Sequence, residues 1–585
     1  MSNMDQKVGN PFENDNARNS TPEDLPYQFV WTTDFARLIS PKNHVLIGAR
    51  GSGKTAIIKM LSHEYLSRLN HESALKLVRD KSFIGTYVPM RLSWVGGLKN
   101  KPWLTEKGRE NHFQWRLNVA CCSAFISTIE SCLRSYVTGK VESIVAERDL
   151  CLQLSAAWFP DTPAESIDTL RQNLAEVEYR KLLDEEKLRV NEGVEFSKVG
   201  VEFDIGLFEP LKRAIAILKN RIKFPQSAIW AVCLDEAEYL SVEYQRILNS
   251  HLRTFADGLV FKITTMPYKH YTLDTNTAVP LVRGDDFDYI YLDSMEVSKR
   301  TLSEYESLRK FSTELFERRL KGSRWEKSGV TLEMLLGTSY ILSEKSVPQD
   351  VLIELIAKHS NEKTLERAKY LLGTSKFDDE IGRKLKGALL LRDASAQIKG
   401  NSSSTIYSGV EMVIRCSDGN PRRFISLLNS MYLAGTDETG FKPVPPSVQD
   451  RILRHFSTTE FRRIISEPNH GNDIHNFLLK IGKFFKDALH FKPLSSDLIL
   501  SFRYNMNDDS TWDVVSEAVG VGLIRPLVEK SDFDELPVRE GTFRLSYMLS
   551  PYFSLLPRRG RAISLSTVLN SPHLPTDQES QMELL

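Results

Sequence analysis

Residues 44–55 read HVLIGARGSGKT, and this stretch decides the fold. Residues 44–47 are a short apolar run ended by a glycine, which is typical of a buried parallel strand. Residues 48–55 match G-x-x-x-x-G-K-T, in which glycines let the backbone curl so that successive N–H groups point at phosphate oxygens. The start of a following helix, expected from residue 55 to about residue 68, adds positive partial charge. The sequence therefore predicts a strand, a phosphate-binding loop and a helix.

The loop residues have distinct expected roles toward a nucleoside triphosphate. Lys54 is expected to reach the β- and γ-phosphates, and the Thr55 hydroxyl is expected to ligate Mg²⁺. A coincidental glycine turn is the weaker explanation, because such a pattern arises by accident in about one chain in a hundred of this length. The residues predicted to bind the nucleotide are Gly48, Arg50, Gly51, Ser52, Gly53, Lys54, Thr55 and Ala56.

A second segment, residues 229–236 (IWAVCLDE), supplies carboxylates at the end of another apolar run. Asp235 is expected to hold Mg²⁺ through water, and Glu236 to polarise a water that attacks the γ-phosphate. Two solvated acids at a strand end are common in isolation, but together with the phosphate-binding loop they predict a site that can hydrolyse the nucleotide.

Two further segments carry groups that could sense the γ-phosphate. Residues 260–267 (VFKITTMP) end a candidate strand in hydroxyls, and we favour Thr265 over Thr264 as the contact. Residues 419–424 (GNPRRF) open a helix at a proline, with Arg422 or Arg423 able to reach back to the nucleotide from a separate lid. Threonines that satisfy their own turn, and ordinary surface charge, are the competing explanations.

The order of apolar runs predicts a doubly wound α/β domain. Further strands are expected at residues 85–92, 228–234, 260–264 and 288–292, and their alternation with helical stretches implies a parallel sheet covered on both faces. About 135 residues separate the second strand from the third, far more than one crossover needs. Helical periodicity within this gap predicts a helical insert at about 110–225.

We divide the chain into five regions. The polar residues 1–26 are expected to be a flexible lead, and residues 27–296 the nucleotide-binding domain with its insert. Amphipathic patterns predict a helical lid at 297–443. Helices followed by two apolar runs predict a winged-helix-like domain with a two-stranded ribbon at 444–569, and a flexible tail follows at 570–585.

Composition restricts the class of protein. The 585 residues contain 76 Lys plus Arg and 76 Asp plus Glu, so a uniformly basic nucleic-acid coat and an acidic disordered chain are both excluded. No apolar stretch is long enough to span a bilayer and the N-terminus is polar, so we expect a soluble, cytoplasmic protein without a membrane partner. The six cysteines lack paired C-x-x-C spacing and are expected to be reduced and buried.

The ordered set GARGSGKT, LDE, TTMP and GNPRR resembles the AAA+ ATPases, and within them the origin-recognition-type initiator ATPases and their prokaryotic relatives. The chain is also similar to large initiator-like ATPases of bacterial genomes that are often associated with anti-phage defence. The resemblance implies ATP and Mg²⁺ as cofactors, Thr265 as sensor 1 and Arg422 or Arg423 as sensor 2. It also makes Arg253 a candidate arginine finger, with surface charge as the alternative.

Two features depart from an initiator. The long insert is not part of a minimal AAA+ core. The loop expected to form the wing is acidic, which disfavours contact with phosphates; its charged residues are Glu529, Lys530, Asp532, Asp534, Glu535, Arg539 and Glu540. Basic residues that could grip a nucleic-acid backbone lie elsewhere in the tail, at Arg451, Arg454, Arg462, Arg463 and within residues 557–561.

Two functions fit these features. The first is an ATP-binding and ATP-hydrolysing AAA+ protein that couples nucleotide state to lid movement and to assembly with itself or a partner effector, in anti-phage defence. The alternative is an initiator-like ATPase that loads on or remodels DNA. Neutral charge and the acidic wing favour the first.

Overall fold

The computed structural model describes residues 10–90, 101, 103–190, 200–253, 258–277, 279–292, 304–343, 347–397, 404–437, 440–527, 536 and 539–571. The chain forms two compact units. We call one the sheet unit, comprising Asn16–Gly48 and Gly53–Leu292. The other, the C-terminal unit, comprises Met1–Asp15, Ala49–Ser52 and Asp293–Leu585.

The sheet unit is built on five parallel strands, as far as the described residues go, in the order β2-β3-β4-β1-β5. The strands are nearly continuous apolar runs because the sheet is covered on both faces. The predicted α/β fold with a parallel sheet is therefore confirmed. The strands are β1 (Asn43–Ile47), β2 (Phe83–Pro89), β3 (Ile229–Asp235), β4 (Leu259–Thr265) and β5 (Phe287–Tyr291).

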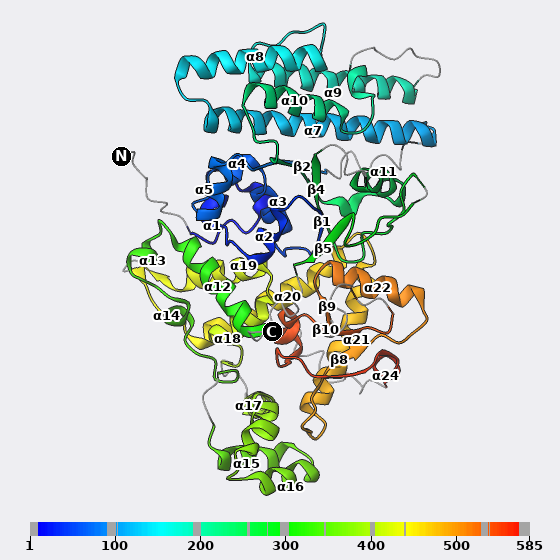
Figure 1. The fold of residues 1–585 in the computed structure, drawn as a ribbon. Coiled ribbons are helices and arrows are strands. Elements are labelled where there is room, and N and C mark those ends of the chain that lie inside the picture. Colours follow the sequence, from blue (N-terminus) through cyan, green and yellow to red (C-terminus); the bar gives the residue numbers. More distant parts are fainter. Residues whose placement is uncertain are drawn as a thin grey trace. The chain divides into compact units, whose positions relative to one another are not determined.

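Short helices pack on this sheet. The helix predicted from residue 55 begins one residue earlier and is divided in two at residues 61–62, and both parts contact strands. Figure 1 shows α3, α4 and α5 grouped beside the strands. The helices are α1 (Leu25–Gln28), α2 (Thr33–Leu38), α3 (Lys54–Met60), α4 (His63–Leu66), α5 (Glu72–Arg79) and α11 (Val242–Arg253).

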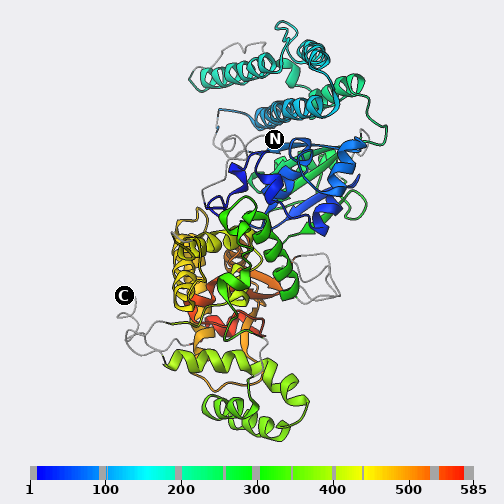
Figure 2. The same ribbon diagram turned by 90° about the vertical axis from the view of Figure 1, so that its left-hand side faces the viewer.

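The predicted insert is a layer of long helices. In Figures 1 and 2, α7 lies nearest the sheet and separates it from α8 and α9. α7 packs on edge strand β2, where the hydroxyls of Thr86 and Thr128 are hydrogen-bonded at 3.1 Å. The helices are α7 (Glu106–Tyr136), α8 (Lys140–Trp158), α9 (Ile167–Val190) and α10 (Glu209–Arg221).

Residues 304–434 of the C-terminal unit are mainly helical where the structure describes them, and their role as a lid stays a prediction. α15, α16 and α17 lie together at one end of this unit in both views (Figures 1 and 2). A small hairpin of β6 (Thr436–Asp437) and β7 (Gly440–Phe441) follows α19. The helices are α12 (Glu304–Leu320), α13 (Arg324–Lys327), α14 (Leu332–Leu336), α15 (Gln349–His359), α16 (Glu362–Leu371), α17 (Arg383–Gln397), α18 (Val410–Ser417) and α19 (Pro421–Ala434).

The last region contains helices and a sheet. The predicted ribbon is the antiparallel pair β9–β10, but it belongs to a four-stranded sheet within the described residues, in the order β11-β8-β10-β9. The elements are α20 (Pro446–Arg463), α21 (Gly471–His490), β8 (Ile499–Arg503), α22 (Asp509–Gly520), β9 (Ile524–Leu527), β10 (Thr542–Leu545), α23 (Ser550–Phe553), β11 (Arg561–Ser564) and α24 (Leu565–Leu569).

Most of the predicted acidic wing, including Glu529, Lys530, Asp532, Asp534 and Glu535, lies outside the described residues, and so do residues 572–585 of the predicted tail. All six cysteines are described, buried and unpaired by disulfides. No helix within the described ranges is long and apolar enough to cross a membrane.

The expectation of a flexible lead was wrong for residues 10–26. Phe12 is fully buried and stacks with Phe316 in the C-terminal unit, at 5.7 Å between ring centroids. The 3-10 helix Ala17–Asn19 lies in the sheet unit, where the Lys59 ammonium donates to its carbonyls. Composition concealed this order, because single side chains such as Phe12, Asp15 and Arg18, spread along a polar segment, make the contacts together with main-chain carbonyls.

A buried charge cluster braces the turn before α19. Asp418 is 4% exposed, has φ +57°, and accepts from Arg544 Nη2 at 2.9 Å and from Arg525 Nε at 3.2 Å. Burial alone would raise the pKa of Asp418, but the two guanidinium groups outweigh it and hold that pKa well below its usual range. The carboxylate therefore ties the α18–α19 turn to β9 and β10.

Replacing Asp418 should test this brace. Asp418→Asn keeps a residue that tolerates left-handed φ but leaves two buried arginines without their counter-charge, so we expect a loss of about 3–5 kcal/mol in unfolding free energy. The native carboxyl has the lowered pKa, so its contribution is present above the unfolded pKa of about 3.9 and declines as the pH falls below it. The difference between wild type and variant should therefore shrink in acid.

Amide hydrogen exchange of β9 and β10 measures this loss. Glu380→Gln, which breaks the exposed pair with Arg367, is the control and should cost less than about 1 kcal/mol. Equal costs for the two variants would contradict the brace.

Candidate active site

The predicted site residues of the sheet unit meet at one edge of the sheet. Strands β1, β4 and β3 are parallel neighbours, with Ile47 opposite Thr265 and Leu234 opposite Ile263. Their carboxyl ends therefore lie side by side, and the Gly48 N–H donates to the Thr265 carbonyl at 3.2 Å. The structure thus brings Gly48, which begins the predicted phosphate-binding loop, to the strand ends that carry the acids and hydroxyls.

Lys54 lies at the start of α3 and folds back over the loop. Its side chain is buried, at 8% exposure, and its ammonium donates to the Gly48 carbonyl at 2.6 Å. Gly51 and Gly53 have φ of +85° and +94°, a left-handed geometry that glycine adopts without strain. Thr55 and Ala56 follow in the first turn of α3. Two glycines of the loop thus have a backbone conformation that residues with side chains rarely adopt.

Asp235 is held by two hydroxyl groups. It is 1% exposed, and it accepts from Thr264 Oγ1 at 2.5 Å and from the Tyr87 hydroxyl at 3.1 Å. Thr264 Oγ1 also accepts the Glu236 N–H at 2.9 Å, so one hydroxyl fixes both acids of the strand end. Burial, aided by the neighbouring carboxylate, raises the pKa of Tyr87, which therefore stays a donor.

Glu236 has an unusual backbone and a cationic partner. Its φ of +70° is costly for a residue other than glycine and sets the direction of its side chain beyond the strand. Its carboxylate is paired with Arg18. A third acid, Glu238, lies nearby; burial raises its pKa, while Lys54 opposes the rise. The site is therefore richer in charge than the two predicted acids suggested.

Thr265 provides the test of whether a nucleotide fits. Its hydroxyl is buried, at 2% exposure, and finds no hydrogen-bond partner within the described part of the chain. A buried hydroxyl without a partner costs free energy, so its position beside Gly48 suits a ligand oxygen or an attacking water. The donor set of ammonium, hydroxyls and carboxylates fits a triphosphate with Mg²⁺.

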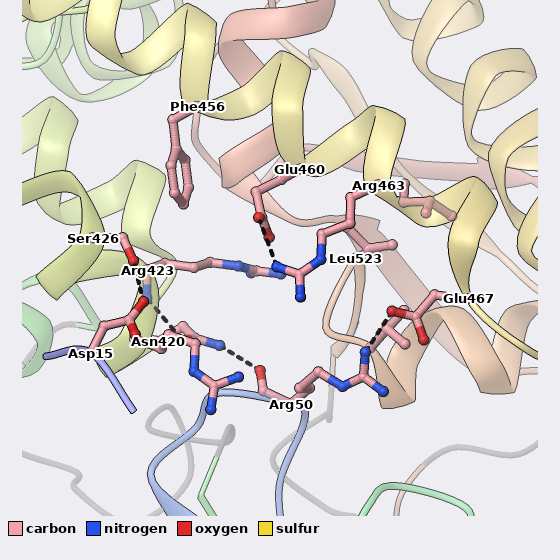
Figure 3. A pocket seen from close by; sticks show the side chains of 13 residues that line it. Asp15, Arg50, Asn420, Arg423, Ser426, Phe456, Glu460, Arg463, Glu467 and Leu523 are labelled. Carbon is pink, nitrogen blue, oxygen red and sulfur yellow. Dashed lines mark hydrogen bonds and ion pairs between the residues drawn. The ribbon is translucent and has the colours of Figure 1, made fainter. Parts of the chain in front are cut away.

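Residues 49–52 and the predicted lid arginines belong to the C-terminal unit, where Arg50, Arg422 and Arg423 line a pocket of about 130 Å³ (Figure 3). Asn420 caps α19 and donates to the Arg50 carbonyl at 2.8 Å, and Arg50 pairs with Glu467 at 2.5 Å. Arg423 is 6% exposed and donates to the Gly522 carbonyl and the Ser546 hydroxyl. Arg422 also lines the pocket.

Arg253, the candidate arginine finger, lies at the end of α11. Its guanidinium contacts the Pro280 carbonyl and lies 3.5 Å from Asp286 within the sheet unit. These contacts neither place it at a nucleotide nor exclude an action on a neighbouring subunit, so its role stays a prediction.

Sequence reasoning missed several residues at this site. Glu238 was visible two positions after Glu236, but no pattern marked it. Tyr87 lies on β2, where no sequence pattern marked a polar residue as functional. Arg18 lies in the segment that was expected to be flexible. Their roles depend on pairing between segments far apart in the chain.

Comparison with known proteins identifies the family of this chain. The ORC-CDC6-like family matches residues 10–565. A solved structure, that of the Aeropyrum pernix ORC1 protein in complex with DNA, is similar over 89% of this chain and 91% of its own, at 11% sequence identity and a TM-score of 0.25. No protein of curated function matches at a significant level. The chain therefore belongs to the ORC-CDC6-like family of origin-recognition-type AAA+ ATPases.

Proposed function

We propose that this protein is an initiator-like ATPase that binds and hydrolyses ATP and uses the cycle to load on or remodel DNA. The observation that carries the ATPase proposal is the meeting of Lys54, Asp235 and the Thr265 hydroxyl at one sheet edge, where that hydroxyl has no hydrogen-bond partner among the residues described. Membership of the ORC-CDC6-like family favours this function over the adaptor-like switch. Anti-phage defence, self-assembly, an effector partner and a cytoplasmic location stay predictions.

The chain's own residues supply the binding chemistry. Lys54 and the main-chain amides of the glycine loop hold the phosphates, with the α3 dipole assisting. Thr55 and Asp235 hold Mg²⁺, which when bound neutralises charge on the phosphate oxygens. Leaving the carbonyl of Gly48 for a phosphate is favourable for Lys54, because a charge-assisted bond to an anion is stronger than one to a neutral carbonyl.

The same edge supplies the hydrolytic groups. Glu236 accepts a proton from the attacking water, and Thr265 orients that water or the γ-phosphate. The hydroxyls of Thr264 and Tyr87 hold the Asp235 carboxylate in place by hydrogen bonds. The hydrogen bond from the Glu236 N–H to the Thr264 hydroxyl fixes the Glu236 backbone, so the carboxylate that acts as the base keeps its direction.

In the lid we propose Arg422 or Arg423 as the sensor. Arg423 donates to Gly522 and Ser546 within the C-terminal unit, so moving it would leave two acceptors behind. Either arginine reaching a γ-phosphate would favour a closed lid, and hydrolysis would release it. The bound nucleotide would then determine whether the lid is open or closed. We propose separately that Arg253 acts as an arginine finger on the nucleotide of a neighbouring subunit.

Exposed arginines of the last region are the proposed DNA contacts. Arg451 and Arg462 lie 11 positions apart on α20, three turns along one face, and Arg561 is exposed on β11. Arg454 and Arg463 are paired with Asp450 and Glu460, which reduces their part in neutralising phosphates.

Two substitutions separate binding from hydrolysis. Lys54→Ala should weaken ATP binding by about a hundredfold, because a charged hydrogen bond to the phosphates is lost. Glu236→Gln should keep binding and lower hydrolysis by at least about a hundredfold, because the base is removed. Isothermal titration and phosphate release measure the two effects.

Lys42→Ala is the matched control. It removes a lysine of the same unit that pairs with Asp288 at the surface, and it should change neither quantity. A Glu236→Gln protein that hydrolyses ATP at the wild-type rate would contradict the role of Glu236 as base.

The two neighbouring threonines should respond differently. Without nucleotide, Thr264→Val should cost about 1–3 kcal/mol, since it leaves a buried carboxylate oxygen and the Glu236 N–H unpaired. Thr265→Val should be neutral or stabilising, because the lost hydroxyl has no described partner, yet it should lower turnover. Amide exchange of β4 and phosphate release measure this, and equal destabilisation by both would contradict the assignment.

DNA binding should be electrostatic and sensitive to α20. The affinity for duplex DNA should fall steeply with salt, and Arg451→Gln with Arg462→Gln should weaken it and reduce the salt slope by about two. Fluorescence anisotropy with a salt titration measures both. Arg367→Gln, on α16, is the control; equal effects, or no DNA binding at low salt, would contradict the proposed surface.

A further inference from the structure

The segment around the 3-10 helix Ala17–Asn19 is fixed to the helix that begins in the phosphate-binding loop. Lys59 of α3 is buried, at 7% exposure, and its ammonium donates to the carbonyls of Ala17 at 3.0 Å and Arg18 at 2.9 Å. The Asn16 side chain accepts the Arg18 N–H at 3.1 Å. The main chain of Arg18 is therefore held on both sides by groups other than its own side chain.

The Arg18 side chain ends at the hydrolytic acid. Its guanidinium pairs with the Glu236 carboxylate, which is only 14% exposed, while Arg18 itself is 55% exposed. Burial raises the pKa of Glu238, and Lys54 and then Arg18 oppose the rise, so Arg18 acts within the same field of charge. A residue of the N-terminal segment thus contacts the group that the reaction needs as a base.

We propose that Arg18 is a positioning residue that restrains hydrolysis by holding the Glu236 carboxylate in an ion pair until the N-terminal segment moves. The inference rests on the proposed function, in which Glu236 receives a proton from the attacking water. A guanidinium that donates to a carboxylate occupies the lone pairs with which that carboxylate would accept a proton from water, so the ion pair keeps the acid from acting as a base. Removing the cation therefore frees the base.

The chain provides a way to relieve the restraint. Asp15 belongs to the C-terminal unit, where its carboxylate accepts from Ser426 Oγ at 2.7 Å, whereas Asn16 belongs to the sheet unit. A single peptide bond joins the two residues, and Arg18 follows two positions later. A displacement of Asp15 would therefore be transmitted along the main chain to the segment that carries Arg18.

The test is the steady-state ATPase of the full chain with Arg18→Gln. We expect kcat to rise by about tenfold, a fraction of what a general base contributes, with the ADP dissociation constant changed less than about twofold. An unchanged or lower kcat would overturn the inference.

Three further variants make the test specific. Arg18→Lys keeps a cation and should give a kcat below that of Arg18→Gln. Lys59→Met releases the segment by another route and should raise kcat without adding to the effect of Arg18→Gln. Arg37→Gln, which removes an exposed arginine paired with Asp34 in the same unit, is the control and should leave kcat unchanged.

The Glu236→Gln background separates this inference from the function on which it rests. If wild type hydrolyses ATP, Glu236→Gln does not, and Arg18→Gln equals wild type, then only the restraint is wrong. If wild type neither binds nor hydrolyses ATP, the proposed function and the inference both fail. Arg18→Gln should have no effect when combined with Glu236→Gln, and a rise in that background would overturn the role of the ion pair.

Discussion

The active site depends on the register of three parallel strands. β4 pairs with β1 on one side and β3 on the other, so the loop after β1, the hydroxyls ending β4 and the acids ending β3 all reach the same edge. Asn43, 2% exposed, fixes this register from the opposite end: its Oδ1 accepts the Phe261 N–H at 2.8 Å and its Nδ2 donates to the Asp286 carbonyl at 3.0 Å. A slip of one residue would turn Thr264 away from Asp235 and separate the acids from their hydroxyl.

Charge at this edge is balanced by side chains that come from separate parts of the sequence. Lys54 closes the loop onto Gly48, and Arg18 neutralises Glu236. The chain passes between the two units at positions 15–16, 48–49, 52–53 and 292–293. Two of these passages lie within the phosphate-binding loop and one lies beside Arg18, so a displacement of one unit acts on the loop and on the base through the main chain. In the proposed function, this connectivity would link nucleotide state to domain movement.

Sequence patterns predicted the parts of this site that are local. A glycine loop between a strand and a helix, and two acids at a strand end, have signatures a few residues long, and the five strands were found within a few residues of their ends. The β11-β8-β10-β9 sheet and the buried Phe12 were missed, because both depend on pairing between segments far apart in the sequence. Tyr87 and Arg18 were missed for the same reason. Thr264 was given second place to Thr265. In the structure the Thr264 hydroxyl is bonded to Asp235 and to the Glu236 N–H, whereas the Thr265 hydroxyl has no partner among the described residues.

The measurement that tests the central claim most directly is an experimental structure of the full chain with Mg²⁺ and a non-hydrolysable ATP analogue. The account predicts the triphosphate against residues 48–55, with the Lys54 ammonium moved from the Gly48 carbonyl to the phosphates. It also predicts Mg²⁺ on the Thr55 hydroxyl and on Asp235, directly or through water, with Thr265 at the γ-phosphate side. A nucleotide bound elsewhere, or a loop that keeps Lys54 on Gly48 at saturating analogue, would contradict it.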